Sequence, residues 1–146
     1  MIDKDAIPLV GKDSMNDMHH EEVEIINTLW EYIEKEDTKA IAKQLEVLLE
    51  HMQEHFSSEE ELMKGKAYPM YSIHQSDHSK VLNEVRHVYM NWRNTKDINQ
   101  VKDYLKNELT VWLDQHIKAM DMPLSDFLQL HQNSQAEEEK DYFFTW

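Results

Sequence analysis

The sequence predicts an all-α protein folded as an up-down-up-down antiparallel four-helix bundle. The 146-residue chain contains only 2 glycines and 3 prolines, so few positions interrupt a helix. Apolar residues recur at steps of three and four in four separate stretches, which is the period of one helical face. Short polar links join these stretches and favour antiparallel neighbours. We expect one bundle domain over residues 1–131, with an N-terminal arm and a short C-terminal helical segment.

The N-terminal arm covers residues 1–15, where Pro8 and Gly11 interrupt any sustained period. The first helix is expected to begin after the arm, with Asn16 or Asp17 as its N-cap. One face of this helix carries His19, Val23, Ile26, Trp30 and Ile33. His20 is rotated by about 100° from that face, so His19 is the neighbour that we expect in the core.

The second and third helices carry further histidines on their apolar faces. Thr38 is expected to cap the second helix, which ends at Gly65, and Tyr68-Pro69 forms an extended link. The core face of the second helix consists of Ile41, Leu45, Leu48, Met52, His55, Glu59 and Leu62. The core face of the third helix consists of Tyr71, His74, His78, Leu82, Val85, Tyr89 and Trp92.

The fourth helix follows a turn at residues 94–97, and its core face consists of Ile98, Val101, Leu105, Leu109, Trp112 and His116. Beyond Asp121, the apolar residues Leu124, Phe127 and Leu128 indicate a short closing segment. Residues 132–146 begin polar and acidic and end in aromatic residues. We expect a separate tail there, which is disordered, docks on the bundle or recruits a protein partner.

Composition excludes several classes of function. Acidic residues outnumber basic ones by 29 to 15, and the formal net charge of −14 repels phosphate backbones and anionic membrane surfaces. Neither nucleic acid nor a membrane is therefore an expected partner. No apolar run could span a membrane and no signal-peptide pattern opens the chain, so we expect a cytoplasmic location. The absence of cysteine excludes disulfides and thiolate metal ligands.

Histidine and carboxylate side chains recur one helical turn apart, at His55 and Glu59 and again at His74 and His78. A single pair of this kind is more often a surface or core pair than a metal site. In an antiparallel bundle, however, these pairs and His19 all fall at the same end. The sequence therefore predicts a metal site with nitrogen and oxygen ligands. His51 lies on the flank of its helix, where we expect it behind the ligands or in solvent rather than on the metal.

His116 and Asp121 complete the set of candidates, although they are five residues apart. A regular α-helix would leave these two side chains about 140° apart. Pro123 disfavours a helical backbone at Met122, so we expect the fourth helix to loosen or end near Asp121. The carboxylate could then turn back toward the site.

The ligand spacing resembles that of the hemerythrins, and within them the single-domain bacterial hemerythrins. The resemblance covers roughly residues 8–130 and rests on His55-Phe56-Ser-Ser-Glu59-Glu60-x-x-Met63, on Tyr68-Pro69 ahead of His74-x-x-x-His78, and on Trp112-x-x-x-His116-Ile117-x-x-x-Asp121. The N-terminal match is looser, because the family often has Ile-Asp-x-Gln-His where this chain has Ser14-Met-Asn-Asp-Met-His19. Val10-Gly11 and Ile26-Asn27 nevertheless keep their family distances from His19.

The resemblance implies a non-heme di-iron centre, with two iron ions bridged by carboxylates and an oxo or hydroxo group. Its ligands would be three histidines on one iron (His74, His78 and His116), two on the other (His19 and His55) and two bridging carboxylates (Glu59 and Asp121). The second iron would keep an open position. Five histidines with two carboxylates argue against the ferritin-like di-iron proteins, which use four carboxylates.

With that centre, the resemblance implies reversible dioxygen binding, for storage, delivery or local depletion of oxygen, rather than enzymatic activity. Phe56, Trp112 and Ile117 would wall the oxygen pocket. Two alternatives stay open at this point. One is a sensor or signalling module that responds to oxygen or redox state, and the other is a di-iron enzyme that handles peroxide or nitric oxide.

Overall fold

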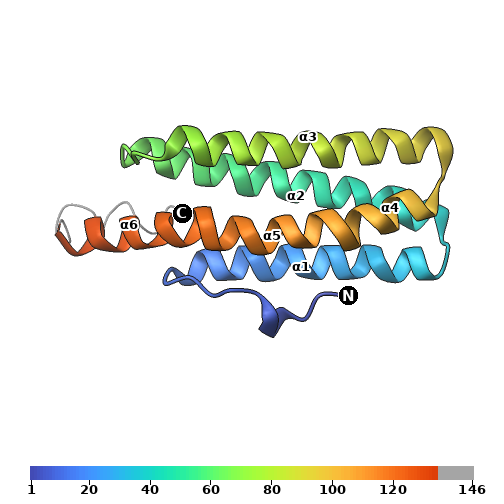
Figure 1. Ribbon diagram of the computed structural model, residues 1–146, viewed down its shortest axis with the longest axis horizontal. Coiled ribbons are helices and arrows are strands. Elements are labelled where there is room, and N and C mark those ends of the chain that lie inside the picture. Colours follow the sequence, from blue (N-terminus) through green and yellow to red (C-terminus); the bar gives the residue numbers. More distant parts are fainter. Residues whose placement is uncertain (135–146) are drawn as a thin grey trace.

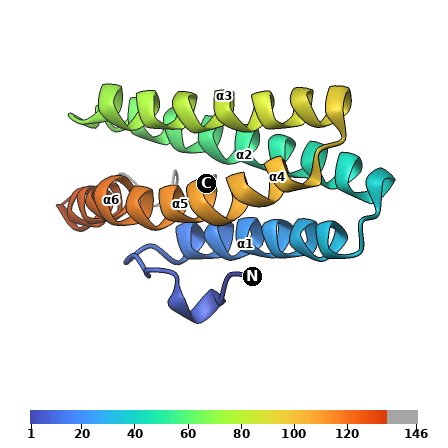
Figure 2. The same cartoon turned by 45° about the vertical axis from the view of Figure 1, so that its right-hand side comes forward.

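The computed structural model describes residues 1–134 and confirms the all-α fold, with no strand in that part of the chain. Three long helices are α1 (Asp13–Glu34), α2 (Thr38–Gly65) and α3 (Tyr71–Thr95). The fourth is continuous through α4 (Ile98–Tyr104), η2 (Leu105–Leu109), α5 (Thr110–His116), η3 (Ile117–Asp121) and α6 (Met122–Ser134). The four lie side by side with alternating direction (Figure 1, Figure 2). No helix within residues 1–134 combines the length and apolar character that a membrane crossing requires.

The C-terminal tail is predicted at residues 132–146, and α6 ends at residue 134. In Figure 1, α6 runs past the ends of the other helices. The rest of the predicted tail, residues 135–146, lies outside the described residues. Its separation from the bundle and its role in recruiting a partner therefore stay predictions.

The start of α1 differs from the prediction, since the helix begins at Asp13 and not after an N-cap at Asn16 or Asp17. The Asn16 amide binds the arm instead. Its side-chain oxygen accepts a hydrogen bond from the Val10 N–H, and its nitrogen donates to the Val10 carbonyl, both at 2.9 Å. These two bonds fix the backbone just before α1, so the side chain stabilises the approach to the helix rather than its first turn.

The links between helices are short and tightly turned. Asp37, one residue before the predicted Thr38, caps α2, because its carboxylate accepts a hydrogen bond from a backbone N–H of the first turn. Each link contains one non-glycine residue at positive φ, namely Glu36 at 54°, Ala67 at 50° and Lys96 at 54°. Positions of this kind favour glycine, so each link holds a conformation that its side chain disfavours.

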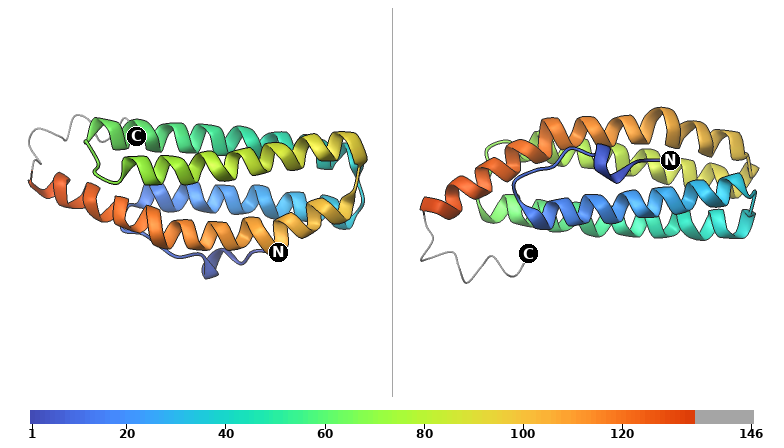
Figure 3. Two further views of the ribbon diagram at one scale, coloured as in Figure 1. Left: turned by 45° about the horizontal axis from the view of Figure 1, so that its top comes forward. Right: turned by 90° about the horizontal axis from the view of Figure 1, so that it is seen from below.

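The N-terminal arm includes a short 3₁₀ turn, η1 (Lys4–Ala6), and lies against the bundle (Figure 3). The Ile2 N–H donates to the Asn27 side-chain oxygen at 2.7 Å, and the Asn27 nitrogen donates to the Ile2 carbonyl at 2.9 Å. At its other end, the Lys12 N–H donates to the Ser125 hydroxyl of α6 at 3.0 Å. The arm therefore connects α1 to the far end of the fourth helix.

The apolar core consists of two clusters. We call one the α4-end cluster, which includes Leu29, Leu48, Met52, Val85, Trp92 and Leu105. We call the other the α6-end cluster, which includes Met15, Leu62, Tyr68, Leu113, Ile117 and Leu128. Along α2, Met52 belongs to the first cluster and Leu62 to the second, and the buried polar residues His55 and Glu59 stand between them. Along α2, a polar layer therefore separates the two clusters.

Candidate metal centre

The structure brings the seven predicted ligand residues into this one polar layer. They are His19 from α1, His55 and Glu59 from α2, His74 and His78 from α3, His116 from α5 and Asp121 from η3. None of them is more than 6% exposed. Acidic side chains are rarely buried so fully unless they are paired or coordinate a metal. The charges of this layer must therefore be balanced by one another or by a bound metal.

The turn between His116 and Asp121 is a π-helix, not the loosened helix end that the sequence suggested. The Met122 N–H donates to the Ile117 carbonyl, five residues back, so this turn contains one residue more than an α-helical turn. The wider turn places residues five apart near the same side, and Asp121 Oδ1 lies 3.1 Å from His116 Nε2. The prediction for Met122 was wrong, because its φ of −60° and ψ of −51° are helical despite Pro123.

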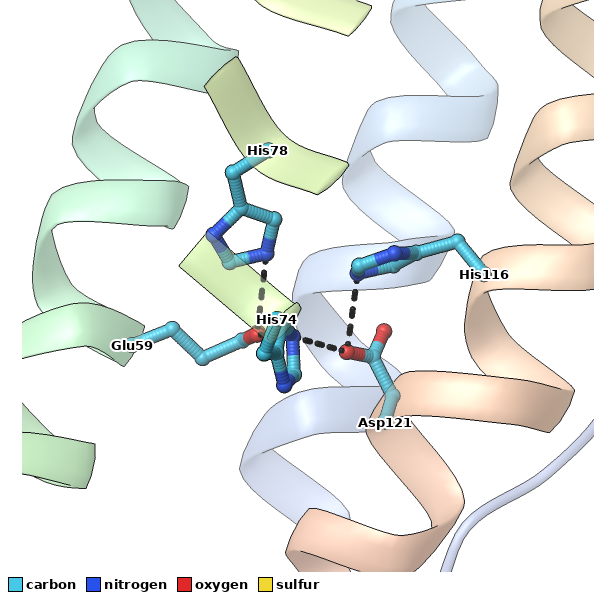
Figure 4. A group of neighbouring side chains, drawn as sticks. All are labelled: Glu59, His74, His78, His116 and Asp121. Atoms are coloured by element: carbon cyan, nitrogen blue, oxygen red, sulfur yellow. Dashed lines mark ion pairs between the residues drawn. The ribbon is translucent and has the colours of Figure 1, made fainter. Parts of the chain in front are cut away.

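Three histidines gather around two carboxylate oxygens, one from Glu59 and one from Asp121, and each oxygen lies close to two of them (Figure 4). Glu59 Oε1 lies 2.8 Å from His74 Nε2 and 3.3 Å from His78 Nε2. Asp121 Oδ1 lies 3.1 Å from the Nε2 atoms of both His74 and His116. One ligand atom from each of these five residues lies within 4.8 Å of all the others. We call this group the three-histidine half of the site.

The five converging atoms are not paired by hydrogen bonds. The three Nε2 atoms, Glu59 Oε1 and Asp121 Oδ1 are buried and have no hydrogen-bond partner within residues 1–134, although they lie close together. Burying polar atoms without partners is costly, and lone pairs aimed at a common point are what a cation needs. Imidazole nitrogens with carboxylate oxygens suit a transition metal such as iron. The buried cluster is therefore able to hold a metal ion.

The other two histidines face the opposite oxygens of the same carboxylates. His55 Nε2 lies 3.0 Å from Glu59 Oε2, and His19 Nε2 lies 2.7 Å from Asp121 Oδ2. The His19 and His55 rings lie 5.8 Å apart, between centroids. We call these two the two-histidine half. Each carboxylate thus turns one oxygen to each half, which is the arrangement of a ligand that spans two metal ions.

Three further carboxylates, which sequence reasoning did not identify, hold the outer nitrogens of the ligand histidines. The Nδ1 contacts are His55 with Glu22 at 3.2 Å, His78 with Glu60 at 3.0 Å and His116 with Asp77 at 2.7 Å. An ionised carboxylate only accepts hydrogen bonds, so each Nδ1 carries the proton and donates it. The Nε2 atom of each ring therefore faces the centre of the site.

Charge pairing decides the protonation of the metal-free layer. Burial alone would raise the pKa of Glu22, but the neighbouring His55 and His51 lower it to about 2. Burial would likewise lower the pKa of His116, but the nearby charge of Asp121 and the hydrogen bond between its Nδ1 and Asp77 raise it to about 9. The carboxylates are therefore ionised and imidazoles hold protons. A metal that binds the imidazole nitrogens must displace those protons.

His51 extends this network to the surface on the two-histidine side. Its Nδ1 lies 3.3 Å from the same Glu22 oxygen that contacts His55, and its Nε2 lies 3.3 Å from the exposed Glu21 carboxylate. His51 therefore stands behind a ligand histidine, in one of the two positions expected for it. Glu22 could have been found from the sequence, since it follows His19 by three residues on the same helical face.

Replacing Glu22 by glutamine is expected to weaken binding of ferrous iron by about ten- to a hundredfold, because the amide carries no charge to hold the His55 N–H in place. Glu21→Gln is the matched control, since the Glu21 side chain is 60% exposed and touches the outer nitrogen of His51. Competition with an iron chelator measures both affinities. Equal affinities in the two variants would show that the Glu22 contact does not orient a metal ligand.

The residues predicted to wall an oxygen pocket lie against the three-histidine half. The Phe56 ring stacks on His78 with centroids 4.0 Å apart, and the Trp112 ring stacks on His116 at 4.4 Å. Ile117 is fully buried in the α6-end cluster. These side chains exclude water from the histidine rings that they cover. Whether they also surround bound oxygen stays a prediction.

Comparisons with known proteins agree with this geometry. The family model for the hemerythrin HHE cation binding domain matches residues 10–128. The bacteriohemerythrin of Aquifex aeolicus is 29% identical over 121 residues, which cover 83% of this chain and 92% of that protein. The bacteriohemerythrin of Stenotrophomonas maltophilia is 26% identical over 129 residues, or 88% of this chain and 82% of the relative. With its helical bundle and buried histidine–carboxylate layer, the chain belongs to the hemerythrin family.

Proposed function

We propose that the polar layer holds two iron ions and that the protein binds dioxygen reversibly. The observation that carries this proposal is the division of each buried carboxylate, with one oxygen toward each half of the site. Carboxylates that bridge in this way hold two metal ions about 3.5 to 4 Å apart. The matching family is named for cation binding, and its curated relatives are named bacteriohemerythrins.

The ligands divide unequally between the two ions. One iron would be bound by His74, His78 and His116, the other by His19 and His55, and both by Glu59 and Asp121. The iron of the two-histidine half therefore has one protein ligand fewer and keeps a free coordination position. When bound, the iron pair supplies this position and the electrons that a dioxygen molecule takes up reversibly.

The surrounding side chains control the environment of that position. The outer carboxylates Glu22, Glu60 and Asp77 fix the histidine rings and keep their Nε2 lone pairs aimed at the metal. Phe56 and Trp112 cover rings of the three-histidine half, and the Phe56 ring also lies 5.3 Å from the His55 ring of the two-histidine half, between centroids. A dry, rigid layer of this kind keeps water and protons away from a bound ligand, so we expect release of oxygen rather than its further reduction.

Protein purified after iron-replete expression is expected to carry about two irons per chain, because the buried ligand set offers nitrogen and oxygen donors for a pair. Anaerobic reduction followed by exposure to air should produce a visible absorption band. Removal of oxygen should then restore the reduced spectrum. A single zinc ion per chain would contradict the di-iron centre, and irreversible oxidation in air would contradict reversible binding.

A further inference from the structure

Two cavities lie on either side of α2 and come close to different parts of the site. The first, which we call the α1–α2 cavity, has a volume of about 170 Å³ and includes Met15, Met18, Ser58 and Leu62 in its lining, with the ligands His55 and Glu59. The second, the α2–α3 cavity, has a volume of about 410 Å³ and includes Phe56, Ser57, Glu60 and His78. Volume alone would favour the second as the ligand site.

The α2–α3 cavity, however, meets only the outer side of a ligand. The Phe56 ring lies nearly parallel to His78, with centroids 4.0 Å apart and planes at 5°, and so covers one face of the imidazole. The Glu60 carboxylate occupies its outer nitrogen, with Oε2 3.0 Å from Nδ1. A small molecule in this cavity therefore meets a blocked histidine of the half that already has three histidine ligands.

The α1–α2 cavity, in contrast, reaches the half with fewer ligands. His55 and Glu59 line it, and these two keep the largest exposure of the seven ligands, at 5% and 6%. His19, which completes that half, is 1% exposed. The ligand side chains that solvent still reaches are thus mainly those beside the two-histidine half. The proposed function places the free coordination position in that half.

The lining of the α1–α2 cavity suits small molecules. Met15 and Leu62 are buried apolar wall residues, and the exposed residues Ser14 and Ser58 stand at its polar edge. Lys12 also lines the cavity, and its pKa is lowered by burial and by the nearby charge of Lys66. Lys12 places a basic group in the lining, in a chain whose overall charge is −14.

We infer that the α1–α2 cavity is the route by which dioxygen and small monovalent anions reach the two-histidine half. The inference rests on the proposed function, because it assumes a free coordination position beside His55. Its volume of about 170 Å³ holds a molecule of two or three atoms, since one water takes up about 30 Å³ in the liquid.

Adjacent serines on α2 provide a matched test, since Ser58 lines the α1–α2 cavity and Ser57 lines the α2–α3 cavity. Both are exposed, so tryptophan at either position should leave the bundle folded. Azide binding to the diferric protein is followed by stopped-flow absorption. Ser58→Trp should slow association and dissociation together by about tenfold, because a plugged route changes both rates and leaves the affinity unaltered. Ser57→Trp should bind azide at the wild-type rates.

A second variant acts in the opposite direction. Met18→Ala shortens a half-buried wall residue of the α1–α2 cavity and should speed azide association. Slower binding in Ser57→Trp with unchanged rates in Ser58→Trp would overturn the inference and assign the route to the α2–α3 side. If Ser58→Trp still binds two irons and binds azide at the wild-type rates, the inferred route is overturned and the proposed function still stands. Wild-type protein without iron would instead overturn the proposed function.

Xenon binding tests the cavity without relying on iron chemistry. Crystals pressurised with xenon should show the gas in the α1–α2 cavity of the wild-type protein, because apolar walls accept it. The same density should be lost in Ser58→Trp. Xenon that occupies the α2–α3 cavity and leaves the α1–α2 cavity empty would overturn the inference.

Discussion

Alanine at position 59 is expected to abolish most iron binding, whereas alanine at position 61 should leave it unchanged. Three consecutive glutamates on α2 have different surroundings in the structure. Glu59 is buried and contacts histidines of both halves, at 3.0 Å to His55 and 2.8 Å to His74. Glu60 is half-buried and contacts the outer nitrogen of His78, and Glu61 is exposed. Loss of iron should therefore decrease in the order Glu59→Ala, Glu60→Ala, Glu61→Ala.

The same series should be visible in thermal unfolding. Iron that binds only the folded site stabilises it by about 4 kcal/mol when free metal exceeds the dissociation constant about a thousandfold. For a chain of this size, about 3 °C per kcal/mol then predicts a rise in melting temperature of about 12 °C. Glu59→Ala should lose most of that rise, and Glu61→Ala should keep it. Melting temperatures that are equal with iron and with chelator in all variants would show that these residues form no shared metal site.

Replacing His19 by alanine is expected to lower the iron content to about one per chain or less, because it removes one of the two nitrogen ligands of the two-histidine half. It also leaves Asp121 Oδ2 buried without the His19 Nε2 atom that lies 2.7 Å away. Iron analysis and visible absorption measure the loss. His20, the next residue, is half-buried and provides the matched control.

His20→Ala should keep about two irons per chain, since its side chain points about 100° away from that of His19 along the helix. The opposite result, with iron lost from His20→Ala and retained in His19→Ala, would mean that α1 is rotated about its axis. The ligand assignment of the two-histidine half would then be wrong, while the three-histidine half would be unaffected.

Helical periodicity was sufficient to predict the bundle and the faces that carry the candidate ligands. The i,i+4 spacing of His55 with Glu59 is local, and antiparallel order then brings it beside His74 and His78 without further information. The π turn at Ile117–Asp121 was beyond this reasoning, because the sequence pattern assumes a constant rotation for each residue. Proline at 123 was interpreted as a stop signal, but the helix continues beyond it.

The outer carboxylates show a second limit of sequence reasoning. Glu60 lies on α2 and contacts a histidine of α3, and Asp77 lies on α3 and contacts a histidine of α5. Such contacts depend on how each helix is rotated and how far it is shifted along its neighbour. A period within one helix does not determine either quantity. Glu22 and Asp77 each follow a ligand histidine by three residues, so a local pattern could place them near the site, but it does not identify the histidine that each contacts.

The polar layer between the two apolar clusters has a consequence for how the protein opens. Regions of a protein that share few apolar contacts can open locally at a lower free energy than complete unfolding requires. Without metal, the α6-end cluster is joined to the rest of the bundle in part across a layer of mutually compensating charges. Two bound metal ions would tie α1, α2, α3 and the fourth helix together at that layer. The cooperativity of unfolding, and with it the protection of backbone amides from hydrogen exchange at the α6 end, would then rise with the occupancy of the metal site.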